Sequence, residues 1–480
     1  MGLTVVDMAR RTMLSLCGVR TMPINSFDDY PMTWRPTLDR SGRALYRTLA
    51  ARLEADIRGG ALRPGTRLPP QRELADFLDV NVSTVSKAFK QCELKGLLSA
   101  TVGSGTFVSY DALTNGRLIS VAHGGLTADL GATVPEPSGN AALLEMARTI
   151  LAEPDAEELF SYRALRRDDW QRDAARLLFC RCGFDARPEQ ILPAPGGQNA
   201  LTAVLAACFR RGDRIAVDDH TYPGVKTAAA MLGIRLVPVS MDDAGMDPVA
   251  LEAACRNEPI AGIYCIPACH NPTTITMPAA RRDALARIAE TYGCLVVEDG
   301  TYQLLAAGER AIADRIPARS IYFISLSKAI SPGLRMAYLA APPDYDAAIS
   351  DALYSLNVTV APLMAEIAAR IVGSGRFEEI AAEHRRRTAA RNAIVSRHLS
   401  EARCRGGGTD IFRWLLLPEH LTGEAFERLA LERGVQVYAA GRFAVGKTVP
   451  LRAARLSICA PHDPKTLERG VRILAELLAE

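Results

Sequence analysis

The sequence of 480 residues predicts an α/β protein made of two unequal parts, a small basic N-terminal domain and a large domain with a mainly parallel sheet. The charge is uneven, because residues 35–110 carry 12 Lys and Arg against 7 Asp and Glu, whereas the 370 residues after them have a net charge of −2. From about residue 140, short Val/Ile/Leu-rich runs alternate with helical periodicity, which is typical of buried parallel strands joined by helices. A composition of 48% hydrophobic and 23% charged residues excludes a wholly disordered or fibrous chain.

Residues 1–34 are expected to form a tail, within which Met1, Met22 and Met32 are alternative starts. This stretch has no signal-peptide core, and the longest apolar run, residues 200–209, is too short to cross a bilayer. The protein is therefore expected to be soluble and cytoplasmic, without a membrane partner. The 11 cysteines are odd in number and scattered, as reduced thiols are, and no ligand pairs stand at a zinc-site spacing, so no metal site is expected.

The basic segment predicts three helices and a hairpin. The apolar repeat of residues 45–57 stops at Gly59-Gly60, a Pro/Gly-rich connector fills 62–70, and a short helix is expected over 71–78. Asn81 or Ser83 caps the next helix, which Gly96 closes. Residues 97–108 then alternate as a hairpin does, with its turn at Gly103-Ser104-Gly105. This order, over residues 35–108, is that of a winged helix-turn-helix, whose second turn-flanking helix enters the DNA major groove.

The polar side chains on these elements are the candidates for DNA contact, although such a face can also simply meet water. They are Arg72, Ser83, Thr84, Ser86, Lys87 and Lys90, with Gly103 and Gly105 in the wing.

Three stretches of this segment carry a resemblance to the DNA-binding domain of GntR-type bacterial regulators: residues 60–75 (GALRPGTRLPPQRELA), 82–88 (VSTVSKA) and 103–108 (GSGTFV). The resemblance implies binding to double-stranded operator DNA. Two positions depart from the family, which often has a basic residue where Val82 and Ser104 stand. Both departures remove cations that would contact phosphate.

Residues 109–125 lack a sustained period and are expected to link the domains. In residues 126–480, six strands and several helices, among them 278–292, are expected. The strands are residues 214–217, 234–239, 261–266, 294–297, 320–326 and 336–340. Ligands of parallel sheets bind at the carboxyl ends of the strands, so the polar residues just past those ends are the candidates for function.

Three clusters at strand ends or helix starts have both a functional and a structural interpretation. Gly196-Gly197-Gln198 opens the helix of residues 200–208, where backbone N–H groups attract an anion, but a glycine pair is often only a turn. Asn271-Pro272 could donate to a phenolate-like oxygen or merely close a turn. Asp299, with Tyr302 three residues on, ends a hydrophobic run and is either a functional or a structural carboxylate.

Two further clusters favour function. In residues 325–335 (SLSKAISPGLR), Lys328 directly follows a hydrophobic run and the hydroxyls of Ser325 and Ser327, and Arg335 comes after it. A desolvated lysine loses its proton and can form a Schiff base. Arg455 lies in an apolar stretch and needs an anion, either a structural acid or a ligand carboxylate.

Together these are the parts that hold pyridoxal phosphate, and residues 125–480 resemble fold-type I aminotransferases. The order and spacing of three residues carry this resemblance: Asp299 follows Asn271 by 28 residues, and Lys328 follows Asp299 by 29. It implies that Lys328 forms the Schiff base and Asp299 pairs with the ring nitrogen. It further implies that Asn271 and Tyr302 hold the ring oxygen, that Tyr222 stacks on the ring, and that Arg455 takes an amino-acid carboxylate. The implied phosphate ligands are Gly197, Gln198, Ser325, Ser327 and Arg335.

A winged helix joined to an aminotransferase-like domain is the organisation of MocR regulators, and nearly the whole chain resembles that subfamily. The resemblance implies a homodimeric transcription factor that senses an amino compound or pyridoxal phosphate. The alternative is an active aminotransferase that carries a DNA-binding domain. One stretch departs from the family: Tyr162 lacks the Pro and Gly that usually follow the tyrosine reaching the partner's phosphate, so its role stays open.

Overall fold

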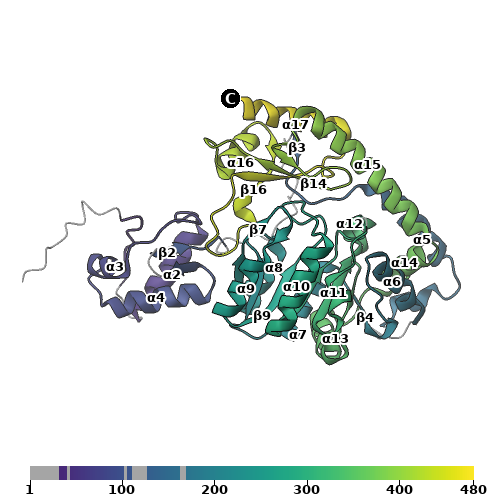
Figure 1. The fold of residues 1–480 in the computed structure, drawn as a ribbon, viewed down its shortest axis with the longest axis horizontal. Coiled ribbons are helices and arrows are strands. Elements are labelled where there is room, and N and C mark those ends of the chain that lie inside the picture. The colour runs from purple at the N-terminus through teal and green to yellow at the C-terminus, as the bar shows by residue number, and fades with distance from the viewer. Residues whose placement is uncertain (1–31, 40–43, 102–104, 111–126, 163–168, 307) are drawn as a thin grey trace, which may run out of the picture.

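The structure of the protein is a computed structural model, which describes residues 32–39, 44–101, 105–110, 127–162, 169–306 and 308–480. Figure 1 shows three regions. The N-terminal helices form a head at one end of the molecule, a large α/β region lies at the centre, and a smaller sheet with long helices covers its upper side.

The head has the predicted elements: α2 (Leu45–Arg58), α3 (Gln71–Phe77), α4 (Val82–Leu94) and an antiparallel hairpin of β1 (Leu98–Thr101) and β2 (Gly105–Val108). Of the two predicted caps for α4, the structure selects Asn81, whose Oδ1 accepts from the Ser83 N–H at 2.8 Å. The head has its own core, in which Leu53 of α2 and Phe89 of α4 are buried. Trp34, just ahead of the expected start at residue 35, also packs into this core.

The large region is built on a seven-stranded sheet of order β4-β12-β11-β10-β9-β5-β6. All neighbours pair in parallel except β12, which is antiparallel to both β11 and β4. The mainly parallel sheet is confirmed, and β4 is a strand that was not predicted. The strands are β4 (Ile191–Ala194), β5 (Arg214–Asp218), β6 (Arg235–Val239), β9 (Ile260–Cys265), β10 (Leu295–Asp299), β11 (Ser320–Ser325) and β12 (Ala337–Ala340).

Alternate side chains of the central strands β5, β9 and β10 enter two separate cores, which explains why these strands are apolar throughout. On one face, Val217, Val297 and Phe323 share a core with residues of α7 (Gly197–Cys208), α8 (Pro223–Leu232) and α13 (Pro343–Asn357). On the other face, Ala216 and Val296 pack with α9 (Pro248–Asn257) and α10 (Ala279–Tyr292). The carboxyl ends of the parallel strands therefore open at one edge between two helical layers.

A second, antiparallel sheet of order β13-β14-β17-β16 lies above that edge (Figure 1). Its strands are β13 (Cys404–Arg405), β14 (Phe412–Leu416), β16 (Tyr438–Ala439) and β17 (Ala453–Ser457). Three helices accompany it: α15 (Arg376–His398), α16 (Gly423–Glu432) and α17 (Pro464–Ala479). The short β3 (Ala128–Asp129), directly after residues 111–126, pairs with β15 (Val435–Gln436).

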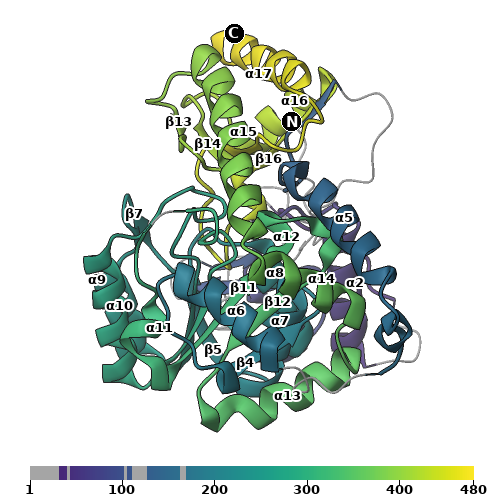
Figure 2. The same cartoon turned by 90° about the vertical axis from the view of Figure 1, so that its right-hand side faces the viewer.

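Three further helices, α5 (Asn140–Leu151), α6 (Asp169–Arg181) and α14 (Pro362–Gly373), cluster on one flank (Figure 2). Both α5 and α6 pack against α14. Within the described residues, we find no helix that combines the length and the apolar character required to cross a membrane.

Candidate cofactor-binding site and DNA-binding face

Lys328 lies directly past the end of β11, in the short helix α12 (Leu326–Ala329). Its Nζ donates to the carbonyl oxygen of Thr133 at 2.5 Å. Burial lowers the pKa of Lys328 to about 8, and the charges of Arg455 and Arg335 act in the same direction. The site therefore raises the fraction of the neutral amine, the form that reacts with an aldehyde, above that of a solvated lysine.

Asp299 is the last residue of β10 and is buried. Its Oδ2 accepts from the Tyr264 hydroxyl at 3.0 Å, and its Oδ1 accepts from the Thr301 N–H at 3.0 Å. Burial raises the pKa of this carboxyl, against the opposite effect of these hydrogen bonds. Tyr264, on the neighbouring strand β9, was missed, although a tyrosine in the otherwise apolar run of residues 260–266 was a visible signal.

An anion cradle lies between the start of α7 and the β11–α12 junction. Gly196 has a φ of +96°, and a Cβ there would come within 2.3 Å of the Arg335 guanidinium. A Cβ on Gly197 would lie 3.1 Å from that of Ser325. Arg335 donates from Nη1 to Ser327 Oγ at 3.2 Å. The structure thus gathers hydroxyls, a guanidinium and the N–H groups of a 12-residue helix, which together suit a phosphate.

Tyr222 borders this cradle at the N-cap of α8. Its hydroxyl donates to Gln198 Oε1 at 3.0 Å, and Gln198 Nε2 donates to the carbonyl of Gly224 at 3.0 Å. Burial raises the pKa of Tyr222 to about 12, so its hydroxyl stays protonated. Gln198 is therefore held by Tyr222 and α8, a contact that its place in the sequence does not reveal.

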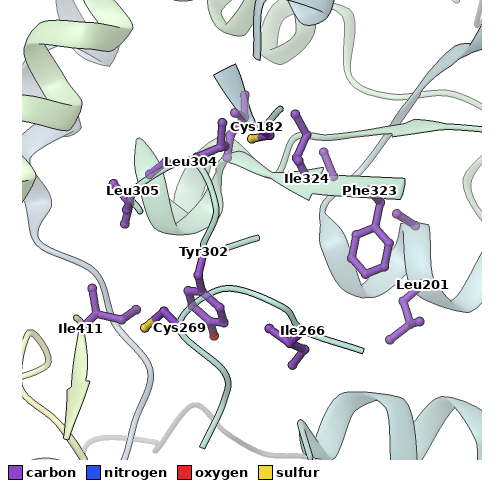
Figure 3. Close-up of a cluster of buried hydrophobic side chains, with 14 of the residues drawn as sticks. Cys182, Leu201, Ile266, Cys269, Tyr302, Leu304, Leu305, Phe323, Ile324 and Ile411 are labelled. Atoms are coloured by element: carbon purple, nitrogen blue, oxygen red, sulfur yellow. The ribbon is translucent and has the colours of Figure 1, made fainter. Parts of the chain in front are cut away.

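Asn271, Tyr302 and Arg455 come together from three distant segments. Asn271 Nδ2 donates to the Tyr302 hydroxyl at 3.4 Å, and Arg455 Nη1 donates to Asn271 Oδ1 at 2.9 Å. Figure 3 shows the Tyr302 ring between Cys269 and Ile266. The peptide bond between Asn271 and Pro272 is cis.

Arg455 is fully buried on β17, in the stretch whose apolar pattern suggested a strand. Its guanidinium lies 4.9 Å from the ring centroid of Phe412, 5.5 Å from Tyr438 and 5.0 Å from Phe443. Burial lowers the pKa of Arg455 to about 10. Its hydrogen bonds go to an amide oxygen and a backbone carbonyl, which carry no net charge, so the guanidinium suits the carboxylate of a ligand.

The segment of residues 131–133, which no motif indicated, joins the two ends of the site. Arg455 Nη2 donates to the Gly131 carbonyl at 2.5 Å, and Lys328 donates to the Thr133 carbonyl. Gly131 fits closely under Tyr438, because a Cβ would come within 2.6 Å of that ring. Tyr162, by contrast, has 87% of its surface exposed, and residues 163–168 lie outside the described residues.

On the head, Arg72, Ser83 and Lys87 are exposed on α3 and α4, as a DNA-facing surface requires, and Thr84 is half-buried. Ser86 instead donates to Gln71 Oε1 at 2.5 Å and so ties α4 to α3.

Lys90 lies 3.3 Å from Glu93 and lines a groove between the head and α8, so its surroundings differ from those of Lys87. Gly105 has a φ of +108°, and a Cβ there would be 3.0 Å from Arg67 Nε. Arg67 therefore covers the wing, although it was not among the predicted DNA contacts. Gly103 lies outside the described residues.

Comparison with known proteins identifies both parts of the chain. Residues 133–474 match the family of class I and II aminotransferases, and residues 45–108 match the gntR family of bacterial regulatory proteins. The chain belongs to the MocR type of GntR regulators. The HTH-type transcriptional regulator YdeF of Bacillus subtilis strain 168 is 50% identical over 458 residues, which cover 95% of this chain and 99% of that protein.

Two other similar proteins have names that refer to vitamin B6 or to a phosphopyridoxyl compound. The vitamin B6 salvage pathway transcriptional repressor PtsJ of Salmonella typhimurium is 26% identical over 421 residues, 85% of this chain and 92% of its own length. The α-aminoadipate aminotransferase LysN of Thermus thermophilus, solved with N-(5'-phosphopyridoxyl)-L-leucine, has a TM-score of 0.67 at 26% identity and covers 76% of this chain and 96% of that one. The cofactor of this MocR-type domain is pyridoxal phosphate. The cradle at Gly196, the buried Asp299 and the lowered pKa of Lys328 fit that group.

Proposed function

We propose that this regulator senses a primary-amine compound, or pyridoxal phosphate itself, at the Lys328 site and changes its DNA binding in response. The observation that carries the proposal is a lysine of lowered pKa, Lys328, just past β11, with the buried Asp299 ending the neighbouring strand β10 and the buried Arg455 acting on the lysine, on the same chain as a DNA-binding head. A metabolic enzyme gains nothing from operator binding, so the head favours regulation over catalysis for its own sake.

Each polar residue of the site has a proposed task. Lys328 holds the cofactor covalently, and Asp299 keeps a proton on the ring nitrogen. Among the contacts described above, the buried carboxylate of Asp299 is the only acidic group available for that task. The cofactor supplies an aldehyde that primary amines can capture. Ser325, Ser327, Arg335 and the start of α7, with Gly197 and Gln198, bind the phosphate, while Tyr222 covers the ring and Asn271 with Tyr302 holds its phenolic oxygen.

Arg455 is proposed to bind the carboxylate of an effector that has one. Its bonds to Asn271 and Gly131 orient the guanidinium without neutralising its charge. Because the charge is buried among aromatic rings, a carboxylate would gain a strong, nearly unscreened partner there.

We also propose that the protein is a homodimer formed through its α5–α6 flank. The helices α5 and α6 lie on this flank (Figure 2) and pack against α14. Exposed apolar side chains on and between these helices are Leu144, Leu151, Phe160, Tyr162, Trp170 and Leu177. Exposed apolar residues gathered in one region of a protein suit an interaction site. Sedimentation of the full chain would give a dimer, and Trp170→Asp together with Leu177→Asp would give a monomer; a monomeric wild type would overturn this part.

The deciding experiment is a visible absorption spectrum of the purified protein with pyridoxal phosphate, titrated with a panel of amino acids and amines. Anisotropy with DNA that the protein selects from a random pool is measured in the same samples. We expect one compound to change both the spectrum and the DNA affinity. A keto acid formed at many turnovers, with unchanged DNA affinity, would instead favour the aminotransferase alternative.

A further inference from the structure

Lys226 is a buried lysine that neither the cofactor site nor the DNA-binding face uses. It lies on α8, and only 2% of its surface is exposed. An ammonium group has three N–H donors and is costly to bury unless they are satisfied. Its Nζ donates to three carbonyl oxygens: those of Tyr110 at 3.3 Å, of Arg442 at 3.3 Å and of Ala444. One of these acceptors belongs to the end of the head, and the other two belong to the region of the small sheet.

The backbone around Lys226 strengthens this joint. The Tyr110 N–H donates to the Gly446 carbonyl at 3.1 Å, and the Ser109 hydroxyl donates to the same oxygen at 3.5 Å. On its other side, the segment of residues 442–446 accepts a bond from the Thr221 N–H to the Phe443 carbonyl at 2.9 Å. The segment is thus held between the end of the head and the start of α8.

The start of α8 belongs to the cofactor site. Tyr222 occupies the N-cap position of α8, and Lys226 is the fourth residue of the helix. The Tyr222 ring packs directly on Gly224 in the first turn, because a Cβ there would lie 2.1 Å from that ring. A shift of the Tyr222 ring therefore acts on the turn of α8 that carries Lys226.

One side of the joint borders a cleft, which Tyr110 and Arg442 both line. This cleft, of about 830 Å³, separates Arg63 and Pro64 of the head from Pro223 and Pro450. The head therefore has room to swing toward the cleft once the contacts at Lys226 loosen.

We propose that Lys226 is the latch through which the cofactor site controls the orientation of the head. The latch consists of the Lys226 ammonium and the carbonyls of Tyr110, Arg442 and Ala444. Occupation of the site by cofactor or effector repositions Tyr222, and α8 transmits that shift to Lys226. The hydrogen bonds between Lys226 and its three acceptors are then strengthened or weakened, which fixes or frees the head. This inference rests on the proposed function, because it assigns the route by which sensing reaches DNA.

The test compares full-length wild type, Lys226→Met, and a matched control, Lys447→Met, which removes an exposed lysine from the loop that follows the latch. Amide hydrogen exchange followed by mass spectrometry is measured for peptides covering residues 105–110 and 442–452. We expect exchange in both peptides to be about tenfold or more faster in Lys226→Met, since charge-assisted hydrogen bonds that hold the joint closed are lost. The control should match wild type.

The second measurement is the ratio of DNA affinities with and without pyridoxal phosphate, beside the absorption spectrum. Lys226→Met should keep the wild-type spectrum and still bind DNA, while its affinity ratio falls to within about twofold of one. The latch proposal would be overturned if Lys226→Met had the same affinity ratio as wild type, or if its amide hydrogen exchange were unchanged. A wild type that shows no cofactor spectrum would instead overturn the proposed function, and the exchange data would still report on the joint. If Lys226→Met does not fold, Lys226→Gln, which keeps two donors, replaces it.

Discussion

The cofactor site and the DNA-binding face use opposite physical strategies. Lys328, Asp299 and Arg455 come from segments that are far apart in the sequence, are brought together by the fold, and have pKa values shifted by burial. Arg72, Ser83 and Lys87 lie within 16 residues of one another on two adjacent helices and face solvent.

The difference determines how each region responds to substitution. In a buried site, each donor and acceptor has a fixed partner, and leaving one unpaired costs its full desolvation free energy. On an exposed face, salt screens each charge and the contacts add nearly independently. A single substitution should therefore almost abolish ligand binding in the cofactor site, whereas on the DNA-binding face it should lower DNA affinity by a small amount.

The largest effect is expected for Lys328→Ala. It should abolish the absorbance of the attached cofactor and the adduct that borohydride fixes on this residue, because no other amine described in the site takes its place. The fold should survive, since a ligand rather than a core contact is removed, and the melting temperature checks this. Lys447→Ala is the control with full absorbance. An adduct in wild type on a lysine other than Lys328 would contradict the assignment.

Arg455→Leu should separate cofactor binding from effector binding. The cofactor spectrum should persist, while the response to any carboxylate-bearing effector should weaken by about a hundredfold, because about two charge-assisted hydrogen bonds are lost. Titration of the spectrum measures this. Arg433→Leu, which removes a surface arginine paired with Glu480, is the matched control. A retained response would show that the effector has no carboxylate or that Arg455 is structural.

The pH dependence of cofactor attachment tests the burial of Lys328 directly. The neutral amine is the reactive form, and its pKa of about 8 lies below the ordinary value of 10.5. The attachment rate should thus rise about tenfold per pH unit below pH 8 and level off above it. Stopped-flow absorbance between pH 6 and 10 measures this rate, and a rate that keeps rising to pH 10 would indicate an ordinary, solvated lysine.

The smallest effect is expected on the head. Lys87→Ala should remove about one phosphate contact and lower the slope of log K against log salt by roughly one unit, with unchanged cofactor binding. Fluorescence anisotropy at several salt concentrations measures this slope. Lys90→Ala serves for comparison, because Lys90 lines the groove between the head and α8. Equal slopes for Lys87→Ala and wild type would remove Lys87 from the interface. The isolated residues 1–110 should bind weakly, since they lack the second half-site contact of a dimer.

Much of this architecture was predictable because strand ends and helix starts are local patterns. The lysine after β11, the carboxylate ending β10 and the glycines before α7 could be found because each is a polar or glycine residue at the end of a hydrophobic run or the start of a helix. The partners of these residues were not predictable in the same way. Tyr264 and the Thr133 carbonyl meet the site only because of sheet order and the path of the chain, and no spacing encodes either. Helical periodicity also cannot show that Ser86 donates to Gln71 or that Lys90 pairs with Glu93.

The two regions can also fold at different times during protein synthesis. The core of the head lies wholly within residues 34–108, so the head can fold as soon as that stretch leaves the ribosome. The cofactor site needs Gly131 near one end of the large domain and Arg455 near the other, which are joined by a hydrogen bond. A chain whose translation stops early therefore has a folded DNA-binding head but no complete cofactor site. Such fragments would bind DNA only weakly, but without responding to any signal, so their removal favours faithful regulation.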